Sequence, residues 1–141
     1  MSEDRLHIAV GVVFRQSENK VLISKRPDNV HQGGLWEFPG GKCRDNENVV
    51  TALKRELYEE LNLSVDSCSP LIIIKHDYPQ QKVKLDVWSV TDWHGEIYGK
   101  EGQLTEWVST SSLSQRDFPA ANSEIIEAIL LLKPNGQIEG R

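Results

Sequence analysis

The 141-residue chain has few cysteines and no long apolar run. Its two cysteines, Cys43 and Cys68, form no CxxC pair, so neither a disulfide framework nor a zinc knuckle is indicated. No apolar stretch approaches the roughly 20 residues of a membrane-spanning helix, and the acidic start MSED is unlike a signal peptide. We therefore expect a cytoplasmic protein that does not enter a membrane.

The sequence also lacks a block of basic residues and the common phosphate-binding loops. The formal net charge is −5, so we expect no nucleic-acid polymer as a partner. The chain contains no GxxxxGKS/T, GxGxxG or GxSxG motif, which excludes the P-loop, the dinucleotide-binding turn and the nucleophile elbow. Nothing beyond ordinary apolar content suggests a large subunit interface, so a monomer is expected.

The composition is that of one folded domain. Hydrophobic residues make up 38% of the chain and charged residues 26%, which fits a globular rather than a disordered protein. We expect a single domain over residues 1–134. Residues 135–141 end in IEGR, a protease-recognition tetrapeptide used in expression vectors, and are expected to be a tail outside the fold.

Strand and helix patterns are mixed along the chain. The helix is expected to begin at a cap formed by Asp45 or Asn46, residues 39–41 are expected to end the strand before them, and residues 92–103 are expected to be a loop. This mixture predicts an α+β sandwich around a mixed β-sheet. The expected elements are two hairpins (6–14 with 20–26, and 70–78 with 83–90), strands at 35–38 and 104–108, and helices at 45–61 and 123–133.

Three glutamates are crowded into the first helix. Glu56, Glu59 and Glu60 are spaced by three and four residues, so they share one helical face, where like charges repel. Two explanations compete: a solvated acidic face, or a site for a hard divalent cation. Oxygen ligands without His or Cys nearby favour Mg²⁺ or Mn²⁺ over zinc. Before the helix, Gly40 and Gly41 would let the backbone approach a metal or a phosphate closely.

The stretch from Gly41 to Leu63 resembles the Nudix box, GX5EX7REUXEEXGU, in which U is an aliphatic residue. Glu47 follows Gly41 after five residues, and the run RELYEELNL follows after seven more. Every fixed position matches except Asn62, where the family has glycine. This position follows the expected helix end, where a left-handed conformation is common and Asn is the most suitable residue after Gly.

Similarity to Nudix hydrolases that act on 8-oxo-dGTP extends over nearly the whole chain. It includes KRPDNVHQGGLWEFPGGK, WHGEIYGKEGQLTEWV and DFPAANSEII. The resemblance implies a Nudix-type α/β/α sandwich. It also implies Mg²⁺-dependent hydrolysis of a nucleoside triphosphate to the monophosphate and pyrophosphate, with Mn²⁺ as a substitute metal. Such an enzyme would remove an oxidised nucleotide before it is incorporated and causes mutation.

A metal site is implied by the same resemblance. Either Glu56 or Glu101 could be the general base, and Arg55 would orient Glu56. Without the resemblance, Glu101 would be taken for an exposed loop acid. The implied ligands are the Gly40 carbonyl, Glu56, Glu59, Glu60 and Glu101.

The resemblance further implies a nucleotide pocket. Asn122 matches the residue that reads the purine edge, and an amide both donates and accepts, which suits an oxidised guanine whose N7 has become a donor. The alternative is that Asn122 caps the last helix. The other positions expected near the nucleotide are Arg26, His31, Phe38 and Tyr78.

Two departures from the family leave the substrate open. Tyr78 stands where phenylalanine is expected, and Gln81 stands where a basic residue is expected. A Nudix hydrolase of CTP, dCTP or another modified nucleotide is therefore the first alternative. A non-catalytic nucleotide-binding module is an alternative from a different class, and the complete set of carboxylates in the box argues against it.

Overall fold

Strand β1 is the centre of the fold. The computed structural model describes residues 4–26 and 33–132, in which β1 (Leu6–Arg15) lies in the middle of a sheet with the path β3-β2-β1-β6-β5. All residues from Ala9 to Phe14 are buried, as expected of a strand that is covered on both faces. The other elements are η1 (Gln16–Glu18), β2 (Lys20–Lys25), β3 (Trp36–Glu37), β4 (Gly40–Lys42), α1 (Val49–Leu61), β5 (Ser64–Asp77), β6 (Lys82–His94), β7 (Thr105–Ser109), η2 (Thr110–Gln115) and α2 (Asn122–Leu130).

The sheet contains both parallel and antiparallel pairs. β1 runs parallel to β6, with Leu6 opposite Val83 and Val13 opposite Val90, and antiparallel to β2 and β4. β5 and β6 form a long antiparallel hairpin, and β7 pairs with β2. These pairings confirm the mixed sheet and both expected hairpins.

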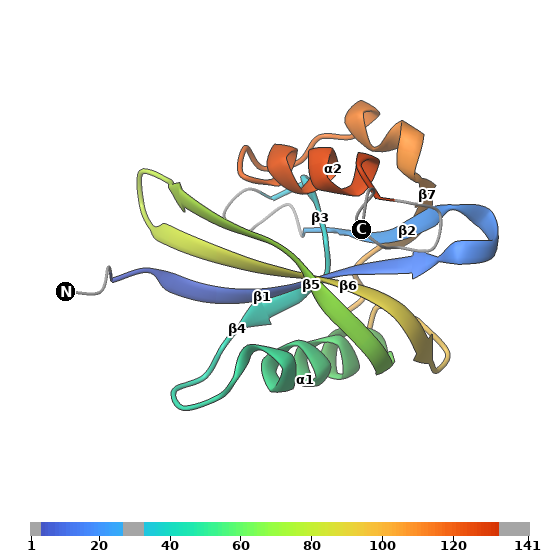
Figure 1. The fold of residues 1–141 in the computed structure, drawn as a ribbon, viewed down its shortest axis with the longest axis horizontal. Coiled ribbons are helices and arrows are strands. Elements are labelled where there is room, and N and C mark those ends of the chain that lie inside the picture. The colour runs from blue at the N-terminus through green and yellow to red at the C-terminus, as the bar shows by residue number, and fades with distance from the viewer. Residues whose placement is uncertain (1–3, 27–32, 133–141) are drawn as a thin grey trace.

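Helices cover both faces of the sheet (Figure 1). α1 lies against one face, and α2 with η2 lies against the other. Successive residues of β1 serve the two layers in turn: Ala9 and Val13 pack into the cluster around α1, while Val10 and Val12 belong to the cluster that contains α2. The expected α/β/α sandwich is therefore confirmed.

Helix α1 is anchored through a stripe of leucines. Leu53, Leu57 and Leu61 are completely buried, and each such leucine contributes about 1.5–3 kcal/mol of hydrophobic stabilisation. A Cβ added to Gly11 of β1 would lie 3.2 Å from side-chain atoms of Leu53 and Leu57. The missing side chain thus lets the helix pack closely against the sheet, with its flank left for the glutamates.

The two ends of α1 differ in how well the sequence predicts them. The N-cap is Asn48, whose Oδ1 accepts a 2.9 Å hydrogen bond from the backbone N–H of Thr51. The expected cap at Asp45 or Asn46 is wrong, because Asn46 adopts a turn conformation with φ of 64°. At the other end Asn62 has φ 59° and ψ 28°, which confirms the left-handed helix end.

Two further expectations need correction. Gly40 and Gly41, expected only to end the preceding strand, form with Lys42 a separate strand, β4, paired with β1. The second hairpin begins at Ser64 rather than at Pro70, and β6 continues to His94, into the expected loop. β5 lies at the edge of the sheet and has a register shift between Pro70 and Ile72, which is how a strand can accommodate proline.

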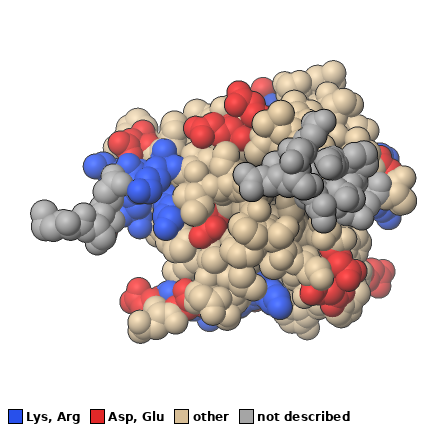
Figure 2. Space-filling view, viewed as in Figure 1, with Lys and Arg blue, Asp and Glu red and all other residues tan. Residues whose placement is uncertain are grey.

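Basic side chains gather at one end of the molecule. Figure 2 shows them at the tip of the β5–β6 hairpin and the start of β1, whereas acidic side chains are spread over the rest of that face. Lys75 lies opposite Lys84 in the hairpin, and Arg5 pairs with Asp77 at 2.8 Å. The overall negative charge is thus interrupted by one local basic region.

Within residues 4–26 and 33–132, no helix is long and apolar enough to cross a membrane. The tail expected at residues 135–141 lies outside the described residues.

Candidate active site

Arg55 links the glutamates of α1 to the residues before the helix. Its Nε and Nη2 donate to the two carboxylate oxygens of Glu47 at 2.8 and 2.9 Å. Its Nη1 donates to Glu56 at 2.9 Å and to Glu59 at 3.3 Å, and Nη2 also donates to the Lys42 carbonyl at 3.0 Å. The Arg55 side chain, only 16% exposed, therefore fixes the Glu56 carboxylate from one side.

Glu47 holds Arg55 in turn. Hydrogen bonds from Arg55 and from the backbone N–H of Arg44 lower the pKa of Glu47 from 4.5 to about 2. The same contact with Glu47 keeps the pKa of Arg55 above its usual range. The pair is consequently ionised throughout the neutral pH range, with a permanent positive charge beside Glu56.

Glu60 lies where a carboxylate is most difficult to ionise. Burial, followed by the negative charges of Glu56, Glu37 and Glu101, raises the pKa of Glu60 from 4.5 to about 8. These acids come from α1, from β3 and from the loop before β7, so three separate parts of the chain direct negative charge to one place. A cation bound there would relieve the repulsion and favour the ionised form of Glu60.

In strand β4 the glycines have no side chain, so the backbone lies close to the carboxylate of Glu56. A Cβ added to Gly41 would lie 2.3 Å from Cδ and 2.5 Å from Oε2 of Glu56. On Gly40 it would lie 2.0 Å from the carbonyl oxygen of Ala9. Gly40 therefore requires glycine, whereas a side chain on Gly41 would have to displace the Glu56 carboxylate. The Gly40 carbonyl, an implied ligand, belongs to the strand that makes this approach.

The loop that carries Glu101 is attached to the end of α1. The side chain of Gln103 joins the two: its Oε1 accepts from the Glu101 N–H at 2.9 Å, and its Nε2 donates to the Glu60 carbonyl at 3.2 Å. The backbone N–H groups of Lys100 and Tyr98 donate to Glu60 and Leu61 at 2.9 and 3.2 Å. An exposed loop acid is in this way held next to the glutamates of the helix.

The side chains fit a hard divalent cation in their chemistry but are not preassembled around one. All the donors are oxygens, and burial together with the neighbouring negative charges of Glu56, Glu37 and Glu101 raises the pKa of Glu60. As the side chains are oriented, no three acidic, His or Cys groups in the described residues stand close enough together to hold an ion. Arg55 accounts for part of this arrangement, because it occupies oxygens of Glu56 and Glu59.

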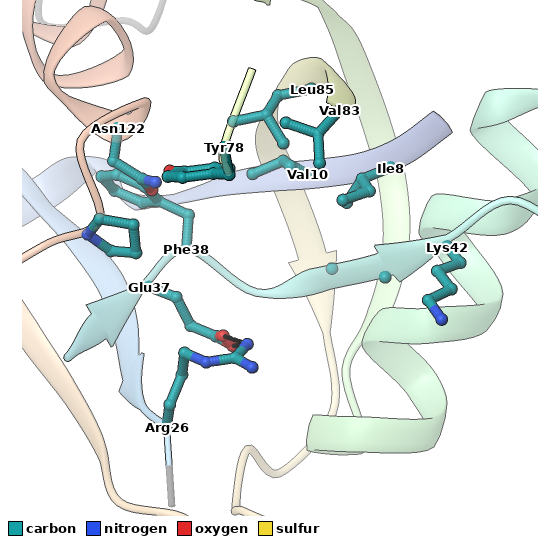
Figure 3. A pocket seen from close by; sticks show the side chains of 13 residues that line it. Ile8, Val10, Arg26, Glu37, Phe38, Lys42, Tyr78, Val83, Leu85 and Asn122 are labelled. Carbon is teal, nitrogen blue, oxygen red and sulfur yellow. Dashed lines mark hydrogen bonds and ion pairs between the residues drawn. The ribbon is translucent and has the colours of Figure 1, made fainter. Parts of the chain in front are cut away.

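A pocket of about 270 Å³ opens beside this cluster (Figure 3). It runs between β1, the β5–β6 hairpin and the start of α2, and it reaches the backbone of β4. Five residues expected at the site contribute to it: Arg26, Phe38, Gly40, Tyr78 and Asn122. His31 lies outside the described residues.

One end of the pocket is aromatic and apolar. Phe38 is buried and stacks on Phe118 with ring centroids 5.2 Å apart, while Tyr78 and Asn122 lie at the same end of the pocket (Figure 3). Asn122 is only 9% exposed, and it is the first residue of α2 rather than its cap. The capping alternative for Asn122 is therefore wrong, because the cap is Ala121 and no side chain caps the helix.

The other end of the pocket is charged. Nη1 of Arg26 pairs with Glu37 at 3.2 Å, and Lys42 lies further along, next to α1 (Figure 3). Burial raises the pKa of Glu37, and the charge of Arg26 opposes this shift. This end lies toward the glutamates, since Glu37 is among the charges that act on Glu60.

Sequence reasoning missed part of the pocket. The apolar floor consists of alternate residues of β1 and β6: Ile8, Val10, Val83 and Leu85. Their alternation was visible as a strand pattern, but nothing in it distinguishes a pocket wall from a core position. Glu37 and Lys42 carried a weak signal, since each is a charged residue beside the short strands around Pro39.

Comparisons with known proteins agree with this geometry. A sequence model of the NUDIX domain matches residues 9–128. The 8-oxo-dGTP diphosphatase of Proteus vulgaris is 44% identical over 102 residues, covering 72% of this chain and 90% of that protein. The CTP pyrophosphohydrolase of Escherichia coli is 31% identical over 126 residues, covering 89% of this chain and 93% of that protein.

A solved structure gives the same result. It comes from a study of MutT from the fish pathogen Aliivibrio salmonicida and from Vibrio cholerae. It superposes with a TM-score of 0.78 at 34% identity, covering 90% of this chain and 98% of that one. The chain therefore belongs to the Nudix family of hydrolases, enzymes that act on nucleotide substrates and generally need a divalent metal.

Proposed function

We propose that the protein hydrolyses 8-oxo-dGTP to 8-oxo-dGMP and pyrophosphate with Mg²⁺, and so removes a mutagenic nucleotide before it is incorporated into DNA. One observation carries the proposal: the pocket that holds the buried amide of Asn122 extends to Gly40 and Gly41 of β4, and Gly41 lies against the carboxylate of Glu56 in α1. The similarity to 8-oxo-dGTP diphosphatases supports the choice of substrate. We further propose that the enzyme works in the cytoplasm, as a single-domain monomer.

The aromatic end of the pocket would hold the base. An oxidised guanine presents a donor at N7 where guanine presents an acceptor, and the Asn122 amide can accept from it. In a pocket with Phe38 and Tyr78 as walls, the wrong base would leave a buried polar group unpaired, which is how strong discrimination arises.

The glutamate cluster would carry out the hydrolysis. The carboxylates of Glu56, Glu59, Glu60 and Glu101 and the carbonyl of Gly40 would hold Mg²⁺. When bound, Mg²⁺ supplies charge neutralisation at the phosphates and a more acidic water.

Proton transfer and phosphate placement fall to the chain's own groups. Glu56 or Glu101 would take the proton of the water that attacks the β-phosphorus, as the bond from that phosphorus to the α-phosphate oxygen breaks and the monophosphate leaves. Arg55 would hold Glu56 in position. At the charged end of the pocket, Arg26 and Lys42 would place the phosphates.

A cytidine nucleotide is the second candidate substrate. The similarity to the CTP pyrophosphohydrolase of Escherichia coli covers 89% of this chain. In addition, Gln81 stands where a basic residue is expected from the family resemblance. The glutamates would bind the metal in the same way, and the aromatic end of the pocket would bind cytosine instead of an oxidised guanine.

A substrate panel tests the proposal. Mg²⁺-dependent hydrolysis of 8-oxo-dGTP, dGTP, dCTP and CTP would be followed with separate detection of pyrophosphate and phosphate. We expect pyrophosphate and a large preference for 8-oxo-dGTP. A preference for CTP or dCTP would transfer the proposal to the second candidate, and no hydrolysis with Mg²⁺ or Mn²⁺ would favour a nucleotide-binding module.

A further inference from the structure

Tyr78 is held firmly at the tip of the β5–β6 hairpin. Its backbone exchanges two hydrogen bonds with Gln81, at 3.0 and 3.2 Å, which close the turn through Pro79 and Gln80. The imidazole of His76 packs against the phenol ring with centroids 4.3 Å apart. The hairpin turn and the ring of His76 thus hold the Tyr78 residue from one side.

The hydroxyl of Tyr78 reaches across to the start of α2. It accepts a 3.1 Å hydrogen bond from the backbone N–H of Ala121, a residue 43 positions away in the sequence. Ala121 is the N-cap of α2, and alanine has no side chain that could satisfy the free N–H groups of a helix start. The Tyr78 hydroxyl thus gives the N–H of Ala121 an acceptor that comes from a distant hairpin.

Asn122 is the residue next to this contact. Its side chain lines the same pocket as Tyr78, at the same end, and it is 9% exposed (Figure 3). Any movement of Ala121 would carry Asn122 with it, since the two are joined by one peptide unit. The position of the amide in the pocket therefore depends on where the hairpin holds α2.

We propose that the Tyr78 hydroxyl is a specificity-positioning group: it fixes the start of α2 and thereby the amide of Asn122 that reads the base. This inference rests on the proposed base-reading role of Asn122. The ring and the hydroxyl of Tyr78 then have different roles. The ring forms a wall of the pocket, which phenylalanine would form equally well, whereas the hydroxyl acts on the base only through Asn122.

The test removes the hydroxyl alone. Tyr78→Phe would be compared with Tyr98→Phe, which removes a hydroxyl from a residue that is 52% exposed. For each variant, kcat/KM would be measured on the four nucleotides of the panel. The selectivity is the ratio of kcat/KM for the preferred nucleotide to that for its closest unmodified or related competitor. The dissociation constant of the product monophosphate, measured by calorimetry, provides a readout without turnover.

We expect Tyr78→Phe to reduce the selectivity roughly 3- to 10-fold, the effect of one hydrogen bond, and to weaken monophosphate binding to a similar extent. The control Tyr98→Phe should leave the selectivity unchanged. In the background of Asn122→Ala, where the reading amide is already absent, the added Tyr78→Phe should change the selectivity less than about twofold.

Three results would overturn the inference, and they can be told apart. An unchanged selectivity in Tyr78→Phe, with a selective wild type, would remove the positioning role and leave the proposed function intact. Equal losses with and without the Asn122 amide would show that the Tyr78 hydroxyl affects selectivity by a route that does not pass through Asn122. A wild type with no base preference would overturn both this inference and the proposed function.

Discussion

At the level of single residues, Glu60 links the electrostatics of the site to pH. Its folded-state pKa of about 8 lies above the usual 4.5, so between these values the folded protein binds more protons than the unfolded chain. This contribution to metal-free stability is complete below pH 4.5 and is lost as the pH rises toward 8. A cation must displace the proton, so the affinity for Mg²⁺ should increase over the same range.

We therefore predict that Glu60→Gln changes the pH dependence of stability. Thermal unfolding in EDTA between pH 5.5 and 8.5 should show a steeper loss of stability with rising pH in the wild type than in Glu60→Gln. Adding Mg²⁺ at pH 8 should stabilise the wild type more than the variant. Parallel pH profiles for the two proteins would show that Glu60 does not titrate with a raised pKa in the folded protein.

A substitution at Gly41 is expected to lower activity without lowering stability. A Cβ at this position would meet the Glu56 carboxylate, which is the flexible end of a side chain and can move aside. Gly41→Ala should thus keep the fold, with a melting temperature close to that of the wild type, and lower kcat by about tenfold or more because Glu56 is displaced. In a Glu56→Gln background the same change should add little, and a further full loss there would contradict the explanation.

At the level of elements, the loop before β7 depends on one amide. Gln103→Ala would remove both the hydrogen bond to the Glu101 N–H and the one to the Glu60 carbonyl. We expect the Mg²⁺ concentration for half-maximal activity to rise several-fold and kcat to recover at high Mg²⁺. The Mg²⁺-dependent shift in melting temperature should weaken in parallel. Gln115→Ala, which changes an exposed glutamine of η2, is the matched control. Equal Mg²⁺ dependence in both variants would show that Gln103 does not hold the Glu101 loop in place for metal binding.

The elements also show which features are readable from sequence. The leucine stripe of α1 and the left-handed Asn62 follow from local rules of helix geometry, and both were predictable. β4 was not, because Gly40 and Gly41 are poor strand residues and the strand exists through its pairing with β1. The start of β5 at Ser64 was hidden by Pro70, since nothing local indicates an edge position where proline is tolerated.

For the whole molecule, the pocket joins parts of the chain that are far apart in sequence. Arg26, Phe38, Tyr78 and Asn122 could be proposed for a site only through the resemblance to the Nudix family, because no local pattern brings them together. The sandwich does so: β1 and β6 form the floor of the pocket, Asn122 of α2 lies at one end, and Lys42, next to α1, lies toward the other (Figure 3). Glu37 was missed for the same reason, as its influence on Glu60 exists only in the folded chain.

The central claim is that the two ends of this pocket divide the work, with base selection at α2 and hydrolysis at α1. The most direct measurement is kcat/KM on 8-oxo-dGTP and dGTP for the wild type, Asn122→Ala and Glu56→Gln. We predict that Glu56→Gln loses several orders of magnitude on both nucleotides. Asn122→Ala should lose its activity mainly on 8-oxo-dGTP, so that the preference largely disappears. If both variants lowered both rates in the same proportion, or if Glu56→Gln stayed active, the division would be contradicted.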